Sequence, residues 1–108
     1  MTDHAQYCVV LTATASADAA ADLAQKIVAA KLAACVQVLP IQSYYVWRGE
    51  ARNDAECLLI IKARVVQYTA LEDFIRTHHA YEIPEIVQLP IAAGFSGYLR
   101  WMDEATEA

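Results

Sequence analysis

The sequence contains few of the residues that cross-link or sharply bend small proteins. Of its 108 residues, three are cysteine, three are proline and three are glycine. An odd number of cysteines with no C-x-x-C pair argues against a disulfide framework and against a zinc ribbon. We therefore expect each cysteine to be a small, buried, apolar residue.

Charged residues are also scarce, and their balance is acidic. They make up 19% of the chain, and the formal net charge is −5. The eight lysines and arginines are scattered and form no basic run. Because an acidic chain without a basic patch repels phosphate backbones, we expect no nucleic-acid partner.

No apolar run approaches the ~20 residues that a membrane span requires. Residues 1–6 have neither the basic start nor the apolar core of a signal peptide, so we expect a cytoplasmic protein without membrane contact.

The length predicts one domain over residues 1–108. The hydrophobic fraction is nevertheless high, at 57%, which suggests that some surface is buried against another subunit.

Apolar runs and turn residues predict the element order βαββαβ, followed by a short helix. The predicted strands cover residues 7–13, 35–47, 56–63 and 85–89, and the predicted helices begin after Ser16, Thr69 and Ser96. Ser16 and Ser96 are expected to cap their helices. Thr69 with Glu72 has the spacing of a capping box, although a helix start one turn earlier also stays open.

Two local features refine the second and third strands. Residues 48–54 are polar enough to form the hairpin turn between them. Pro40 cannot donate a hydrogen bond to a strand ladder, so it predicts either a bulge or an edge position.

This order is that of the α+β ferredoxin-like fold, a split βαβ arrangement in which two helices cover one face of an antiparallel sheet. The opposite face is left open. Residues 58–61 are apolar on both faces of their strand, whereas the strands of a one-sided sheet alternate. We therefore expect another subunit or the terminal helix to cover the open face.

The segment from Thr77 to Glu85 gathers two imidazoles, a phenol and two carboxylates where a helix gives way to a strand. Imidazole and carboxylate groups are common metal ligands. A structural interpretation also fits, because imidazoles at a helix C-terminus suit the helix dipole, while Tyr81 packs and Glu82 bonds a backbone group. Both interpretations stay open.

Several motifs, in one order, resemble those of the CutA family of divalent-cation-tolerance proteins. They are Leu32-Ala33-Ala34-Cys35, Tyr45-x-Trp47-x-Gly49, His79-x-Tyr81-Glu82-x-Pro84-Glu85-Ile86 and Tyr98-Leu99-x-Trp101. The resemblance implies a compact ferredoxin-like homotrimer, similar in plan to the PII-type signalling trimers. The chain departs from the family pattern at Gln37, Ala63 and Ala80, where Asn, Thr and Pro are usual.

The resemblance also implies a role in tolerance of metal ions through binding of a divalent ion, copper first, with no organic cofactor. It makes His79 and Glu82 the ligand candidates, with Cys35 as a thiolate candidate. In the strand order 4-1-3-2, Cys35 lies at the opposite end of the sheet from His79, about 17–20 Å away. A site that used both would lie between subunits, and Cys57 is the better thiol on topology.

The aromatic residues Tyr44, Tyr45 and Trp47 near the hairpin could stack a ligand, but we favour a role as anchors of the oligomer interface. No nucleophile or metalloprotease motif appears, so we expect no enzyme. The main alternative function is a PII-like sensor or adaptor trimer without a metal role. Its inter-subunit cleft would bind a protein or a small anion, the latter through Lys62 and Arg64.

Overall fold

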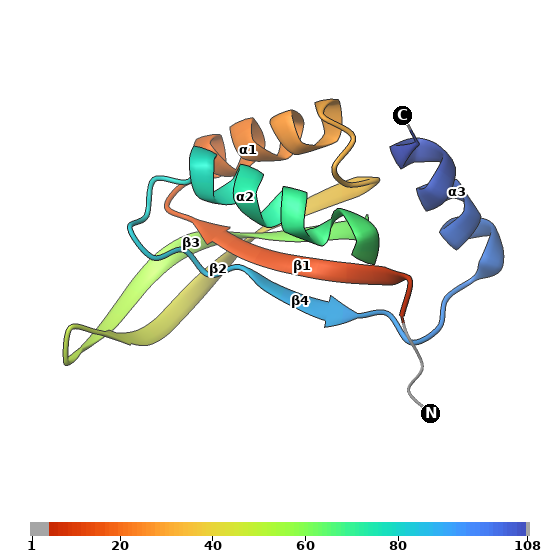
Figure 1. The fold of residues 1–108 in the computed structure, drawn as a ribbon. Helices are drawn as coiled ribbons and strands as arrows, with labels where there is room; N and C mark the ends of the chain where they lie inside the picture. Colours follow the sequence, from red (N-terminus) through yellow and green to blue (C-terminus); the bar gives the residue numbers. More distant parts are fainter. Residues whose placement is uncertain (1–4, 108) are drawn as a thin grey trace.

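The structure is a computed structural model that describes residues 5–107. Over these residues the chain forms four strands and three α-helices (Figure 1). In chain order they are β1 (Tyr7–Thr14), α1 (Ala17–Ala29), β2 (Cys35–Trp47), β3 (Glu50–Arg64), α2 (Tyr68–His78), β4 (Val87–Pro90) and α3 (Ser96–Thr106), with a 3-10 helix, η1 (Val65–Gln67), before α2. None of the described helices is long and apolar enough to cross a membrane.

The four strands form one antiparallel sheet in the order β2-β3-β1-β4. Helices α1 and α2 lie side by side over one face of this sheet, and α3 stands at the end of the sheet where β1 begins (Figure 1). The arrangement confirms the predicted ferredoxin-like fold and the predicted strand order.

The core lies between the sheet and the two long helices. Along β3, every second side chain from Cys57 to Ala63 is buried, as expected for a strand with one covered face. These side chains meet apolar residues from both helices. The largest buried side chains of the core are Val10, Ile27, Leu59, Ile61, Leu71 and Ile75.

Two of the three cysteines match the expectation of small buried residues. Cys8 and Cys57 are buried, whereas Cys35 is half-buried. Burial raises the pKa of the Cys8 thiol to about 11, which keeps the thiol protonated and unreactive at neutral pH.

The opposite face of the sheet carries apolar side chains that remain partly exposed. The strand pairing aligns Leu11 with Ile60 on one side and with Val87 on the other. Val87 and Leu89 of β4 are exposed by 43% and 48%. An apolar sheet face of this kind is unusual for a surface that meets only water.

Helix α3 covers only one end of this open face. Its Asp103 accepts a hydrogen bond of 2.9 Å from the Tyr7 hydroxyl, and Thr106 accepts one of 2.8 Å from Arg64. The remainder of the face, towards β4 and the middle of β3, has no cover from the described part of the chain. The terminal helix alone therefore does not bury it.

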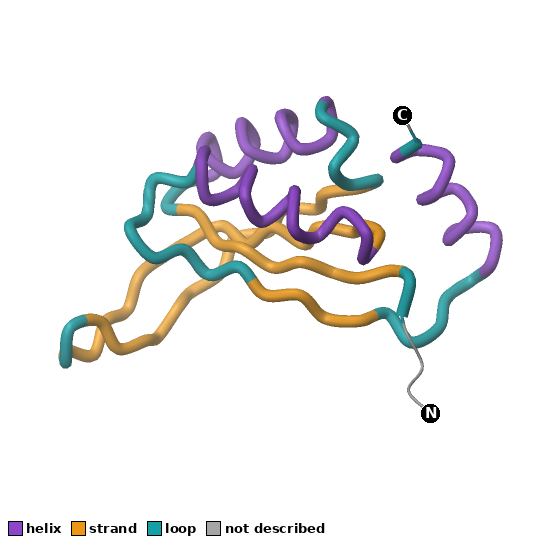
Figure 2. The backbone as a smooth tube through the Cα atoms, viewed as in Figure 1, coloured by secondary structure: helices purple, strands orange, loops and turns teal. Residues whose placement is uncertain are grey.

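The hairpin between β2 and β3 projects beyond the two helices as a long arm (Figure 2). The turn contains only Arg48 and Gly49, with φ of 51° and 80°, and Trp47 pairs directly with Glu50. The predicted seven-residue turn over 48–54 was therefore wrong. Positive φ at both central residues gives a turn whose twist matches that of the strands, so polar residues 50–54 can extend β3.

The two prolines of the sheet lie on its edge strands. Pro40 belongs to β2 and pairs with Cys57 without a break in register, so the edge interpretation is confirmed and no bulge occurs there. Pro90 ends β4, which begins at Val87 rather than at the predicted residue 85. The strand is shorter because residues 84–86 stay outside the ladder with β1.

Of the three predicted helix caps, only Ser16 is confirmed. Its Oγ accepts a hydrogen bond of 3.1 Å from the Ala19 N–H in the first turn of α1. Ser96 is the first residue of α3, and the cap position is taken by Phe95, whose side chain makes no capping bond. Ser96 therefore lies one residue too late to act as the cap.

The capping box of Thr69 and Glu72 does not form, and the alternative of a helix start one turn earlier is confirmed. Helix α2 continues from η1 and begins at Tyr68, so Thr69 lies inside the helix. Glu72 instead accepts a hydrogen bond of 2.8 Å from the Tyr68 hydroxyl. The 3-10 turn therefore begins the helix, where the sequence pattern predicted a cap by the Thr69 side chain.

The two serines allow a matched test of helix capping. Ser16→Ala removes the acceptor of the Ala19 N–H and should lower the free energy of unfolding by about 1 kcal/mol. Ser96→Ala removes no capping bond and should change it by less than about 0.5 kcal/mol. Urea denaturation at one protein concentration measures both. Equal effects of the two substitutions would contradict the assignment of Ser16 as a cap.

Candidate functional site

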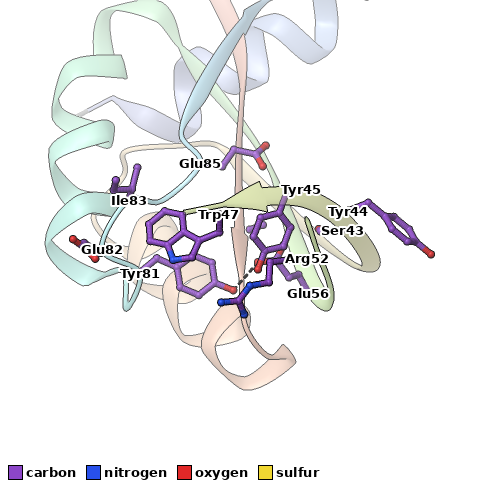
Figure 3. A pocket seen from close by; sticks show the side chains of 11 residues that line it. Ser43, Tyr44, Tyr45, Trp47, Arg52, Glu56, Tyr81, Glu82, Ile83 and Glu85 are labelled. Carbon is purple, nitrogen blue, oxygen red and sulfur yellow. Dashed lines mark hydrogen bonds between the residues drawn. The ribbon is translucent and has the colours of Figure 1, made fainter. Parts of the chain in front are cut away.

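A hollow of about 600 Å³ lies between the β2–β3 hairpin and the segment that joins α2 to β4 (Figure 3). Three parts of the chain contribute most of its wall. They are residues 43–47 of β2, residues 52 and 56 of β3, and residues 81–85 of the joining segment. The segment that the sequence analysis singled out thus forms one side of a concave surface.

Two tyrosines of the hollow donate hydrogen bonds to carboxylates of β3. The Tyr81 hydroxyl donates to Glu56 at 2.6 Å, and the Tyr45 hydroxyl donates to Asp54. Burial, together with the bond to Glu56, raises the pKa of Tyr81, while the bond to Asp54 is the main cause of the raised pKa of Tyr45. Both phenols therefore stay protonated and act as hydrogen-bond donors.

Carboxylates outnumber cationic groups around the hollow. Glu56, Glu82 and Glu85 line it, against Arg52 as the one lining cation among the described residues. Glu82 is partly neutralised by Arg48, whose guanidinium lies 3.2 Å away. Glu82 thus bonds a side chain rather than the backbone group that the structural interpretation predicted, and the lining keeps an excess of negative charge.

His79 fastens the joining segment to the sheet. Its Nε2 lies 2.8 Å from the Ala13 carbonyl oxygen of β1, and its Nδ1 accepts a hydrogen bond of 3.1 Å from the Tyr81 N–H. Because Nδ1 is an acceptor, Nε2 carries the proton and donates to Ala13. Both ring nitrogens are therefore engaged within the chain, and they place Tyr81 in the wall of the hollow.

The neighbouring His78 has a different role. Its ring stacks on Phe74 with centroids 4.1 Å apart, and its Nδ1 lies 2.8 Å from the Phe74 carbonyl oxygen. These contacts remain within α2, near its C-terminus, where imidazoles were predicted. The two adjacent histidines thus face different surroundings, since only His79 bonds across to β1.

The two cysteines considered as ligands lie away from the hollow. Cys35 pairs with Lys62, whereas Ala13, the partner of His79, pairs with Leu58. The two pairing positions are four residues apart along β3, about 13 Å. Cys57 is closer to the His79 end but is buried in the core.

Within residues 5–107, no group of three or more His, Cys, Asp or Glu side chains is arranged to hold a metal ion. His79 has both nitrogens engaged, Glu82 pairs with Arg48, and Cys35 lies at the other end of the sheet. The three predicted ligands are therefore not brought together by one chain, and they do not fit a metal site formed within it.

The basic residues proposed as anion contacts are used to dock α3. Lys62 Nζ lies 5.7 Å from the centroid of the Tyr98 ring, and Arg64 donates to Thr106 at 2.8 Å. Neither residue lines the hollow. Within one chain, both cations therefore contact α3 and not the hollow.

The three hairpin aromatics take different directions. Tyr45 and Trp47 turn towards the middle of the hollow, whereas Tyr44 points away from them (Figure 3). Tyr44 is exposed by 75%. The guanidinium of Arg48 lies 5.3 Å from the centroid of the Trp47 ring, within the range of a cation–π contact.

Sequence reasoning missed Arg52, Asp54 and Glu56 as members of this region. Residues 52 and 54 were assigned to the turn, and Glu56 was only the start of a strand. Predicting a two-residue turn at Arg48-Gly49 would have placed these residues in β3, because that turn sets Arg52 opposite Tyr45. The Arg-Gly pair was the available signal, since glycine readily adopts positive φ.

Known proteins with similar sequences bear one family name. The chain is 41% identical over 99 residues to "Protein CutA 1, chloroplastic" from rice, covering 91% of this chain and 56% of that protein. It is 40% identical over 99 residues to "Divalent-cation tolerance protein CutA" from Thermus thermophilus, covering 91% and 96%. The chain thus spans little more than half of the rice protein and nearly all of the bacterial one.

A solved structure supports the same assignment. The periplasmic divalent cation tolerance protein CutA from Archaeoglobus fulgidus superposes with a TM-score of 0.92 at 31% identity, covering 94% of this chain and 99% of that one. The profile of the CutA1 divalent ion tolerance protein family matches residues 8–105, which include the hollow and all of the sheet except Tyr7. The resemblance seen in the sequence motifs is thereby confirmed, and the chain belongs to the CutA1 divalent ion tolerance protein family.

Proposed function

We propose that the protein is a cytoplasmic homotrimer that binds divalent metal ions, copper first, and contributes to tolerance of such ions. Membership of the divalent ion tolerance family is the observation that carries this proposal. The names of the relatives describe tolerance rather than a reaction, which favours a binding protein over an enzyme. No organic cofactor is part of the proposal.

The open face of the sheet supports self-association. It presents Leu11, Ile60, Val87 and Leu89 in neighbouring strands, and the last two are nearly half exposed. Covering such a face removes apolar surface from water, and this stabilises the assembly by about 25 cal/mol for each Å² buried. Identical faces from three copies, meeting at a common axis, would provide that cover.

The hairpin aromatics supply a second contact region in this proposal. Tyr44 lines the hollow, but its ring points away from Tyr45 and Trp47, and it is the most exposed of the three. Large aromatic side chains at this position suit interface anchors. Tyr45 and Trp47 form the adjoining surface, next to the turn at the tip of the same arm.

The metal ligands His79, Glu82 and Cys35 would have to be combined between copies. One chain keeps Cys35 apart from His79 by the length of the central sheet, so the missing donors must come from a neighbour. His79 must also release one of its two ring hydrogen bonds, each contributing about 1 kcal/mol. Both requirements favour weak metal binding. Among divalent ions, Cu²⁺ suits imidazole and thiolate donors.

A second candidate is a small-ligand sensor or adaptor trimer without a metal role. The hollow of about 600 Å³ favours it, because this volume lies within the range of small-molecule sites. The candidate shares the trimer with the first proposal but does not require bound metal.

The trimer predicts a mass in solution of three times the 11.9 kDa chain at micromolar concentration. Leu89→Glu places a charge on the open face and should shift the protein towards smaller species. Val66→Glu is the matched control, because Val66 is 80% exposed in η1 and away from that face. Sedimentation velocity measures all three. A wild-type protein that sediments as a single 11.9 kDa species would refute the trimer.

The metal proposal predicts that His79→Ala weakens binding of Cu²⁺ about tenfold or more. His78→Ala is the control, because it removes an adjacent imidazole that bonds only within α2. Calorimetric titration should also show weaker binding as the pH falls towards about 5, since protons compete for imidazole nitrogen. Cys35→Ser and Glu82→Gln test the remaining ligands in the same assay. Equal affinity of both histidine variants and the wild type would remove His79 from the site.

A further inference from the structure

We propose that the hollow between the β2–β3 hairpin and the α2–β4 segment binds a small organic cation that carries an amine or quaternary ammonium group. This inference goes beyond metal binding and names the ligand class for the small-ligand candidate, on which it rests. It requires three properties of one site, namely aromatic walls, an excess of carboxylates and a suitable size.

Aromatic rings form much of the wall. Tyr45, Trp47 and Tyr81 line the hollow, two from the hairpin and one from the segment opposite (Figure 3). The face of such a ring attracts a cation within about 6 Å of its centroid. Arg48 already lies 5.3 Å from the Trp47 centroid, so this ring is seen to accept a cation in the structure.

The carboxylates give the hollow a negative charge. Glu56, Glu82 and Glu85 line the hollow against Arg52 alone, and the chain as a whole carries a net charge of −5. Glu56 accepts the Tyr81 hydrogen bond at 2.6 Å, which holds this carboxylate beside the Tyr81 ring. A bound cation would therefore meet negative charge beside the rings.

Other ligand classes fit the hollow less well. A phosphate or nucleotide would face Glu56 and Glu85 with Arg52 as its principal partner, since Arg48 and Glu82 are paired with each other. A bare metal ion would find no group of three donor side chains among residues 5–107. A neutral apolar ligand would take the carboxylates out of water without bringing a positive charge to offset that cost.

The hollow is built by one chain, and its rim is available to a neighbour. Tyr81 and Glu56 are half-buried beneath it, and the bonds from His79 to Ala13 and Tyr81 hold that wall in place. Ile83, on the rim, is 69% exposed, and Tyr44 turns away from the centre. Another copy in the proposed trimer could thus narrow the entrance without supplying the carboxylates.

The test compares choline with 3,3-dimethylbutan-1-ol, in which carbon replaces the charged nitrogen and the shape is kept. Calorimetric titration of the full chain in excess chelator excludes metal ions. Choline should bind about tenfold or more tightly than the neutral analogue, because only the cation gains from the rings and carboxylates. Inorganic phosphate, titrated in the same way, should not bind. Equal affinity for choline and the alcohol, or stronger binding of phosphate, would overturn the proposal.

Charge-neutralising variants locate the site. Glu56→Gln keeps an acceptor for the Tyr81 hydroxyl but removes the charge, and it should weaken choline binding about tenfold. Glu104→Gln removes the same charge from the exposed surface of α3 and should change nothing. If Glu56→Gln fails to fold, Glu85→Gln serves in its place. Unchanged choline affinity in the folded variant would refute the site. Loss of choline binding with Cu²⁺ binding retained would show that the two functions are separate.

Discussion

The pairing of β2 with β3 is the constraint on which the described site depends. It runs from Cys35 opposite Lys62 to Trp47 opposite Glu50 without interruption. A shift of one residue would turn every side chain of one strand to the other face of the sheet. If β2 shifted in this way, the hollow would lose Tyr45 and Trp47. The short Arg48-Gly49 turn fixes this register at one end.

Much of the fold could be predicted because burial leaves a periodic record in the chain. The layers were predicted correctly from three features, namely the apolar run of β3, the spacing of Leu23 and Ile27 in α1, and the edge prolines. Errors occurred where local geometry, not burial, decides. The polar residues 50–54 have the composition of a loop, but they pair along an exposed arm. Helix α2 starts from a 3-10 turn, whose start is not marked by a Ser or Thr cap.

The candidate site was only partly predictable. The sequence directed attention to residues 77–85, and strand order alone separated Cys35 from His79. The two hydrogen bonds of His79 could not be foreseen, because one partner, Ala13, lies 66 residues away and offers only its carbonyl oxygen. A backbone acceptor leaves no trace in residue type. The contribution of Glu56 likewise appears only once the hairpin register is known.

The prolines of the outer strands also affect how the sheet meets other chains. β2 is an edge strand of 13 residues, long enough to template unwanted strand addition. The ladder to β3 continues through Pro40, so the N–H that proline lacks is missing from the outer side of the strand. Pro90 has the same position on β4. Both edge strands therefore contain a residue that cannot donate a hydrogen bond to an added strand, which disfavours open-ended strand addition at these edges.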